Sequence, residues 1–364
     1  MLRAGIIGFG SSGKTTLFRL MTSVREAPRH GQHGKAEANV GVSRVPDPRL
    51  ERLSAMYNPR KKTHATVEFA DMAGAGHGGG GAKELLDVAP FRNADALVHV
   101  VRLFRDPAIP HPSGAVDPLR DIQAMEDELI LADLGVVERR LERLDKDLKK
   151  SASADLKAEQ HILGACRQAL EDGSPIRKLQ LSGDDLKRLR GFQFLSAKPL
   201  LLVLNIDESD IPRLDTVIDS AGFRPFLERT LAHAVPLCAR IELEIAELGE
   251  DDAKAFMTDL GLAESGLDRV IRASYDLLGY ISFFTVGEDE CRAWSIPRHT
   301  HAQLAAGEIH TDIQRGFIRA EVVAYDALIS RGSLAHAREH GELRLEGKDY
   351  VVADGDVINF RFAT

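Results

Sequence analysis

The chain has 364 residues, of which 44% are hydrophobic and 28% are charged, and its formal net charge is −8. These values are typical of a globular protein with two or three domains. No apolar run approaches the roughly 20 residues that cross a bilayer, and the acidic balance disfavours bulk, nonspecific nucleic-acid binding. We expect a cytoplasmic chain with no membrane partner, and its three widely spaced cysteines fit a reducing compartment.

The first predicted element is a buried strand at residues 2–7, which leads directly into a glycine-rich loop. Residues 8–15 match G-x-x-x-x-G-K-[ST] without a mismatch, and residues 16–21 have the apolar spacing of a helix. Glycine permits backbone angles and a close approach that a Cβ would block, and the loop amides then point at an anion from the positive end of the helix. The pattern predicts a nucleotide-binding loop made of Gly8, Phe9, Gly10, Ser11, Ser12, Gly13, Lys14, Thr15 and Thr16.

Side chains in and after this loop have the chemistry of a magnesium–phosphate site. Lys14 can reach the β- and γ-phosphate oxygens, and the Thr15 hydroxyl can ligate Mg²⁺. Residues 64–71 alternate like a strand and end at Asp71, which begins a D-x-x-G motif that ends at Gly74. We expect Asp71 to hold the Mg²⁺ shell and the Gly74 amide to sense the γ-phosphate.

The D-x-x-G motif is followed by His77 and four glycines at residues 78–81. This composition predicts a switch loop that orders with nucleotide, or else a plain flexible connector. His77 is the nearby side chain whose type could position the attacking water. The alternative is a low intrinsic rate that an ordered loop or a partner raises.

A later apolar strand at residues 199–204 precedes Asn205, Ile206 and Glu208, which we expect to read the base. Guanine-selective GTPases have N-K-x-D here, and its Asp accepts two hydrogen bonds from guanine. A glutamate is one methylene longer and cannot be assumed to repeat that contact. Residues 235–239 predict the last strand and a base-backing loop at Cys238 and Ala239. The bound nucleotide is therefore ATP or GTP, with both left open.

Between these strands, residues 117–192 form a predicted helical insertion. Apolar side chains recur there at three- and four-residue steps, as on one helix face that packs against a partner helix: Ile130, Leu134, Val137, Leu141, Leu144 and Leu148. Residues 151–153 break the pattern before a returning helix. A charged hairpin of this kind can grip a partner, or it can be a solvated structural element.

From about residue 280 the pattern changes to short β-rich runs with glycine turns, which favours a small ubiquitin-like β-grasp domain. Several stretches resemble the YchF / Obg-like ATPase family of translation-factor-class P-loop NTPases, and the similarity covers nearly the whole chain. They are residues 45–50, 205–208, 292–297, 307–312 and 354–360.

The resemblance implies an α/β fold with a mostly parallel P-loop sheet, a helical coiled-coil insertion and a C-terminal TGS domain. It also implies ATP use alongside or ahead of GTP, and contact with the ribosome or RNA through the TGS-like domain and the hairpin. This sequence departs from the family pattern in the catalytic loops, where Lys35 aligns with the switch I threonine. Ala75 stands where the family has a hydrophobic residue in place of a catalytic glutamine.

We expect a nucleotide-binding domain at residues 1–116 and 193–278, the insertion at 117–192 and the TGS-like domain at 279–364. The expected function is slow, Mg²⁺-dependent hydrolysis of the γ-phosphate of ATP or GTP by a monomer that works with the ribosome. The alternative is a nucleotide-gated ribosome-binding scaffold with little or no hydrolysis.

Overall fold

The computed structural model describes residues 3–22, 39–71, 88–151, 153–219 and 222–363. The chain forms two compact units. The larger consists of Met1–Val42 and Glu68–Ser274, and the smaller consists of Ser43–Val67 and Tyr275–Thr364. Residues 43–67, from the first half of the chain, thus belong with the C-terminal residues. The domain boundaries that the sequence suggested stay a prediction.

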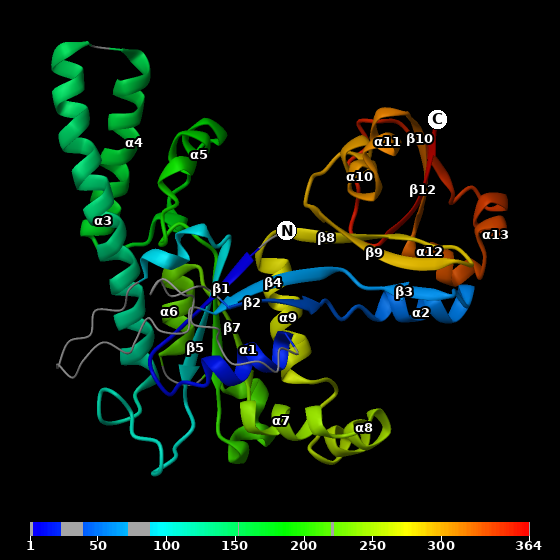
Figure 1. Cartoon of the computed structure of the whole chain (residues 1–364), viewed down its shortest axis with the longest axis horizontal. Coiled ribbons are helices and arrows are strands. Elements are labelled where there is room, and N and C mark those ends of the chain that lie inside the picture. Colours follow the sequence, from blue (N-terminus) through cyan, green and yellow to red (C-terminus); the bar gives the residue numbers. More distant parts are fainter. Residues whose placement is uncertain (1–2, 23–38, 72–87, 152, 220–221, 364) are drawn as a thin grey trace, which may run out of the picture. The chain divides into compact units, whose positions relative to one another are not determined.

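The larger unit is built on a six-stranded sheet in the order β2-β4-β1-β5-β6-β7 (Figure 1). The pairings from β4 through β1, β5 and β6 to β7 are parallel. Strands β5 and β6 are buried at every position, as expected where both faces of a parallel sheet are covered. The predicted mostly parallel sheet is confirmed. Its strands are β1 (Arg3–Ile7), β2 (Asn39–Arg44), β4 (Thr66–Asp71), β5 (Ala96–Arg102), β6 (Leu200–Asn205) and β7 (His233–Leu237).

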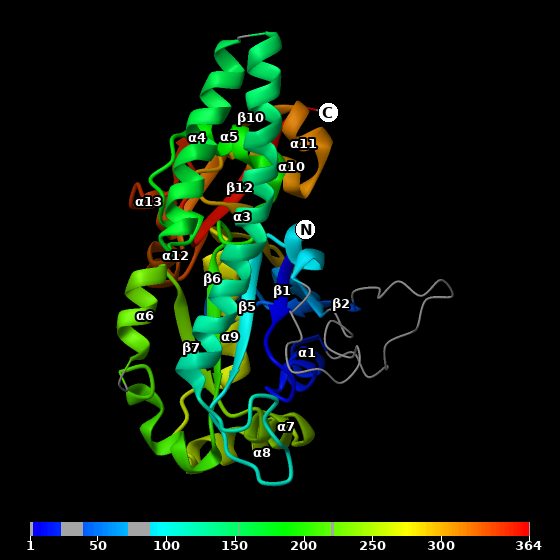
Figure 2. The same cartoon turned by 90° about the vertical axis from the view of Figure 1, so that its left-hand side faces the viewer.

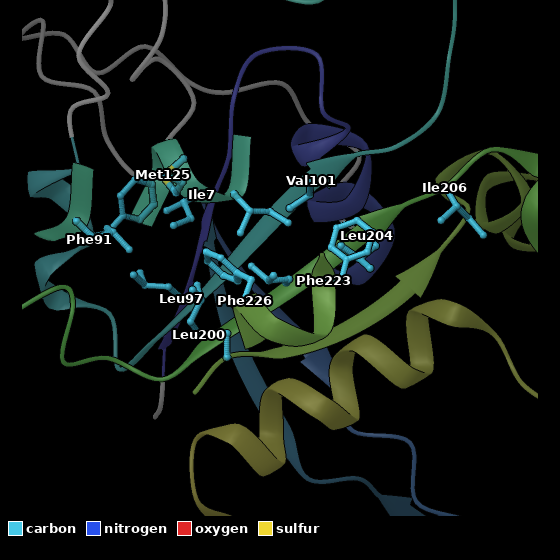
Figure 3. Close-up of a cluster of buried hydrophobic side chains, with 14 of the residues drawn as sticks. Ile7, Phe91, Leu97, Val101, Met125, Leu200, Leu204, Ile206, Phe223 and Phe226 are labelled. Atoms are coloured by element: carbon cyan, nitrogen blue, oxygen red, sulfur yellow. The ribbon is translucent and has the colours of Figure 1, made fainter. Parts of the chain in front are cut away.

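A continuous apolar core joins this sheet to its helices. Leu97 and Val101 of β5 and Leu204 of β6 pack with Met125 of α3 and Phe226 of α6 (Figure 3). The helices that begin in the larger unit are α1 (Lys14–Thr22), α3 (Pro118–Lys150), α4 (Ala154–Glu171), α5 (Gly183–Leu189), α6 (Phe223–Thr230), α7 (Ala239–Glu247), α8 (Glu250–Asp259) and α9 (Gly266–Leu277).

The predicted helical hairpin is present as α3 and α4, which run side by side in both views (Figures 1 and 2). Asp117 caps the start of α3, and the Ser153 hydroxyl caps α4 by accepting from the amide of Leu156 at 3.1 Å. The facing surfaces bury the apolar positions that the sequence pattern had marked, including Val137 and Leu144. No helix in the described ranges is both long and apolar enough to cross a membrane.

The smaller unit contains a mixed six-stranded sheet in the order β11-β10-β12-β8-β9-β3. Helix α10 packs on it over a core that includes Phe283, Ala305, Val322 and Phe360, so the predicted C-terminal β-grasp arrangement is confirmed. The strands are β3 (Lys61–Thr63), β8 (Tyr280–Thr285), β9 (Glu290–Pro297), β10 (Phe317–Ala324), β11 (Arg344–Glu346) and β12 (Asp356–Phe362). The helices are α2 (Pro48–Tyr57), α10 (Ala302–Ile309), α11 (Thr311–Arg315), α12 (Tyr325–Arg331) and α13 (Leu334–Glu339).

Residues 43–67 are an integral part of this unit. Strand β3 pairs in parallel with β9, with Lys61 opposite Glu290. Arg49 of α2 donates to Asp47 at 2.8 Å and to Asp354 at 2.7 Å, and Asp354 also accepts from the amide of Ser282. These bonds fasten α2 to the turn that precedes β12.

Candidate nucleotide-binding site

The strand register brings the carboxyl ends of the central strands to one edge of the larger unit's sheet. Asp71 ends β4 opposite Ile6, and Asn205 ends β6 opposite both Arg102 and Leu237. The loop after β1 begins at this edge with Gly8. In open parallel sheets, ligands bind outside the carboxyl ends of the strands, so the sequence-predicted residues lie where a ligand is expected.

The backbone of this loop has the shape that its glycines allow. Gly8 and Gly13 have φ angles of 145° and 102°, and Ser11 is left-handed at 60°. A Cβ at Gly8 would lie 2.5 Å from the carbonyl oxygen of Val100, and a Cβ at Gly13 would lie 2.5 Å from Nδ2 of Asn205. Both positions therefore exclude a side chain by conformation and by space.

The charges of Lys14 and Asp71 each shift the pKa of the other group at this loop. Burial lowers the pKa of Lys14, although the charge of Asp71 raises it. Burial likewise raises the pKa of Asp71, although Lys14 lowers it. Lys14 Nζ donates to the carbonyl oxygen of Phe9 at 2.6 Å, so its ammonium group is held at the loop itself.

Asn205 joins the two loops that a nucleotide would touch. Its Nδ2 donates to the carbonyl oxygen of Ser12 at 3.0 Å, and its Oδ1 accepts from the amide of Ala239 at 3.0 Å. The side chain is only 4% exposed. One amide group thus fixes the phosphate loop relative to the predicted base-backing loop.

The other predicted base-site residues differ in how far their side chains are exposed to solvent. Ile206 and Cys238 are buried, and Ile206 donates its amide to the carbonyl oxygen of Leu237 at 2.9 Å. The Ile206 side chain is therefore enclosed, and its amide is held by β7. Glu208 is half exposed, and its Oε2 lies 3.8 Å from Nη1 of Arg240.

The polar residues of β5 and of the segment after it were not predicted from the sequence to belong to the site. The guanidinium of Arg102 is buried and donates to the carbonyl oxygens of Phe104 at 3.2 Å and Ile109 at 2.9 Å. It thereby fixes the segment that leads to Pro112, whose Cγ would be 3.4 Å from a Cβ at Gly10. The sequence did carry one signal for this role, which is an arginine at the end of an otherwise apolar predicted strand.

The imidazole ring of His111, in the same segment, is also held in place. Nε2 of His111 lies 2.9 Å from Oδ2 of Asp121, which also accepts from Arg120 through Oδ1. The ring is therefore oriented by a carboxylate at the start of α3. Gly74 and His77, which the sequence suggested for catalysis, lie outside the described residues, as do Lys35 and Ala75.

The residues present fit a magnesium–triphosphate ligand. Glycine positions that exclude a Cβ leave room for phosphate oxygens against the backbone, and the Ser12 hydroxyl is buried with no hydrogen-bond partner among the described residues. Thr15 and Asp71 offer a hydroxyl and a carboxylate, which are hard oxygen donors. The described ranges contain no group of three or more His, Cys, Asp or Glu side chains placed to hold a metal. Mg²⁺ commonly takes only one or two protein ligands beside phosphates and water.

The parallel sheet, the glycine loop at the end of β1 and the asparagine at the end of β6 together define the P-loop class of nucleotide-binding proteins. Residues 280–363 match the family model YchF-GTPase_C, described as a protein of unknown function (DUF933). A Bacillus subtilis (strain 168) protein named "Ribosome-binding ATPase YchF" is 41% identical over 363 residues, which are 99% of each chain.

An Escherichia coli O157:H7 protein of the same name is 40% identical over 367 residues, again 99% of each chain. Among solved structures, the Schizosaccharomyces pombe YchF GTPase superposes with a TM-score of 0.84 at 30% identity, covering 99% of this chain and 97% of that one. The chain belongs to the YchF family, which confirms the resemblance seen in the sequence.

Proposed function

We propose that this protein binds a purine nucleoside triphosphate with Mg²⁺ and slowly hydrolyses its γ-phosphate in association with the ribosome. The observation that carries the proposal is the loop of residues 8–15, in which Gly8 and Gly13 exclude a Cβ and Asn205 fixes the Ser12 carbonyl. A loop held open in this way presents its amides to an anion at the start of α1.

The roles of the loop residues follow from their positions. The amides of Ser11 to Thr15 cradle the β- and γ-phosphates, and Lys14 moves from the Phe9 carbonyl to the phosphate oxygens. Thr15 and Asp71 would hold Mg²⁺, which would neutralise negative charge on the phosphate oxygens. The amide of Gly74 is proposed to sense the γ-phosphate.

Base recognition is assigned to the loops that Asn205 joins. The backbone of Ile206, the Glu208 carboxylate, Cys238 and Ala239 form the base site. Glu208 is one methylene longer than the aspartate that pairs with guanine, so ATP is expected to bind at least as well as GTP. The ion pair between Glu208 and Arg240 is exposed and long, so it holds the carboxylate only weakly.

Hydrolysis is expected to be slow. Without an arginine finger or a positioned glutamine, phosphoryl transfer of this class is slower by about 10³- to 10⁵-fold. His77 remains our proposal for the side chain that positions the attacking water. An ordered loop or a partner would then set the physiological rate.

The relatives' printed name, together with one charged surface, supports a ribosome partner and hence a cytoplasmic location. The exposed tip of the α3–α4 hairpin, which we call the hairpin tip, carries basic side chains interspersed with acidic ones such as Glu142, Asp145 and Asp155. The basic residues are Arg143, Lys146, Lys149, Lys150 and Lys157. On a chain of net charge −8, these exposed lysines and arginines can still contact phosphate backbones. The exposed Arg315, Arg319 and Lys348 of the TGS-like unit would add to that contact, and we expect the protein to act as a monomer.

Single-turnover hydrolysis of γ-labelled ATP, with and without ribosomes, tests the proposal. We expect slow release of phosphate that ribosomes accelerate, and no release by Lys14→Ala. Wild-type protein that binds nucleotide and ribosomes but never releases phosphate would instead identify a nucleotide-gated scaffold. Lys14→Ala protein with unchanged affinity and rate would contradict the assignment of the loop.

A further inference from the structure

A buried histidine, His99, lies opposite the strand residue that leads into the phosphate loop. His99 occupies the middle of β5, between Ile7 of β1 and Leu202 of β6, and it is 1% exposed. Neither ring nitrogen has a hydrogen-bond partner among the residues that the structure describes. Buried polar groups are nearly always paired, and each exception calls for a structural or functional cause.

Its surroundings connect His99 to the loop. Alternation along β5 places it on the side of Leu97 and Val101, which pack in one cluster with Ile7 (Figure 3). Ile7 directly precedes Gly8. The position that a Cβ of Gly8 would take lies 3.2 Å from Oγ of Ser12 and 3.4 Å from Cδ of Lys14. The Ser12 hydroxyl and the Lys14 side chain therefore lie beside Gly8, the residue that follows the strand partner of His99.

Ser12 supplies the matching group. Its hydroxyl is also buried, at 3% exposure for the residue, and also lacks a partner among the described residues. Burial lowers the pKa of His99 to about 3, and the charge of Lys14 lowers it too. The ring is therefore neutral at physiological pH, with one donor and one acceptor nitrogen. A hydroxyl can serve either one.

We propose that His99 is a positioning residue of the phosphate loop, and that its imidazole hydrogen-bonds to the Ser12 hydroxyl when nucleotide is bound. The bond fixes the Ser12–Gly13 peptide from below, while Asn205 holds the Ser12 carbonyl. An unpaired imidazole in the free protein is a cost to folding that becomes useful only with ligand bound. The inference rests on the proposed nucleotide site.

The test compares melting temperature and nucleotide affinity in the full chain. His99→Leu replaces an unpaired polar group by an apolar one, so the melting temperature of the nucleotide-free protein should be unchanged or higher. Its affinity for Mg·ATP should fall about five- to tenfold, the value of one net hydrogen bond. His99→Gln, which keeps a donor and an acceptor, should restore most of the affinity.

Ser12→Ala provides the second arm, which also serves if His99→Leu does not fold. Its affinity should fall by a similar factor, and the double variant should lose no more than either single one, because both remove the same bond. His233→Leu, at an exposed histidine of β7 in the same sheet, is the matched control and should bind Mg·ATP like the wild type.

Three results would overturn the inference: wild-type affinity in His99→Leu, wild-type affinity in Ser12→Ala, or additive losses in the double variant. A purely structural role would move melting temperature and affinity together. Failure of the proposed function gives a different result, because the wild-type protein itself would then show no affinity for Mg·ATP.

Discussion

At the scale of single residues, Asn205 illustrates what sequence can and cannot specify. Its place after an apolar strand predicted a base-reading asparagine. The structure shows a side chain whose described bonds go to the Ser12 carbonyl and the Ala239 amide, while its role in reading the base stays a prediction. These partners lie 193 and 34 residues away, and no local pattern encodes such pairings. The same holds for His99, whose burial depends on neighbouring strands.

Truncation of Asn205 is expected to be costly. Asn205→Ala leaves two buried backbone groups unpaired, so the free energy of unfolding should fall by about 1–3 kcal/mol, and nucleotide affinity should fall with it. Asn359→Ala removes an exposed side chain that donates to Glu321, and should stay within about 0.5 kcal/mol of the wild type. Urea denaturation measures both. Equal losses in the two variants would contradict the bridging role.

One residue, His99, should make the stability of the folded protein depend on pH. His99 has a folded-state pKa of about 3, against 6.5 for an ordinary histidine. Between these values the unfolded chain binds more protons. Stability therefore rises with pH across this window and is lost as the pH falls from about 6.5 toward 3. One such group contributes a slope of up to about 1.4 kcal/mol per pH unit.

Urea denaturation of wild type and His99→Gln between about pH 5 and 6.5 measures this slope. The wild type should lose stability more steeply than the variant as the pH falls. Parallel curves would show that His99 is protonated, or solvent-accessible, in the folded protein.

At the scale of elements, the phosphate loop was predictable because its constraints are local. Glycine spacing, a preceding apolar run and a following helix all lie within residues 2–22. Gly13→Ala tests the geometry, since φ is 102° and a Cβ would collide with Asn205. We expect nucleotide binding, followed with a fluorescent ATP analogue, to be lost.

Gly164→Ala is the matched control, because a Cβ at this position in helix α4 meets nothing within 4 Å. It should leave binding intact and raise stability by about 0.5–1 kcal/mol. If both glycine variants bind like the wild type, the loop does not form the site that we propose.

The α3–α4 hairpin was also predictable, because its apolar steps extend over several turns. The function of the hairpin was not predictable, because exposed charged side chains can contact either a partner or water. Replacing Lys146, Lys149 and Lys150 with serine should weaken co-sedimentation with ribosomes and flatten its salt dependence, with nucleotide affinity unchanged. Glu142→Gln, exposed on the same helix, is the control. Unchanged co-sedimentation of the triple variant would assign the hairpin a structural role alone.

At the scale of the whole molecule, the placement of residues 43–67 was beyond the sequence analysis. Nothing in Lys61–Thr63 indicates a strand that pairs with β9, some 230 residues later, because that pairing is tertiary. The two units otherwise follow the predicted order of a P-loop sheet, an inserted hairpin and a β-grasp sheet. The chain therefore passes from the larger unit to the smaller within β2, returns within β4, and passes to the smaller unit again after Ser274.

Calorimetric titration of the full chain with Mg·ATP, and separately with Mg·GTP, tests most directly whether the loop after β1 holds a triphosphate. We predict saturable binding at one site, with ATP at least as tight as GTP. Folded wild-type protein that gives no saturable heat with either nucleotide, and no rise in melting temperature at saturating Mg²⁺ and nucleotide, would contradict the account.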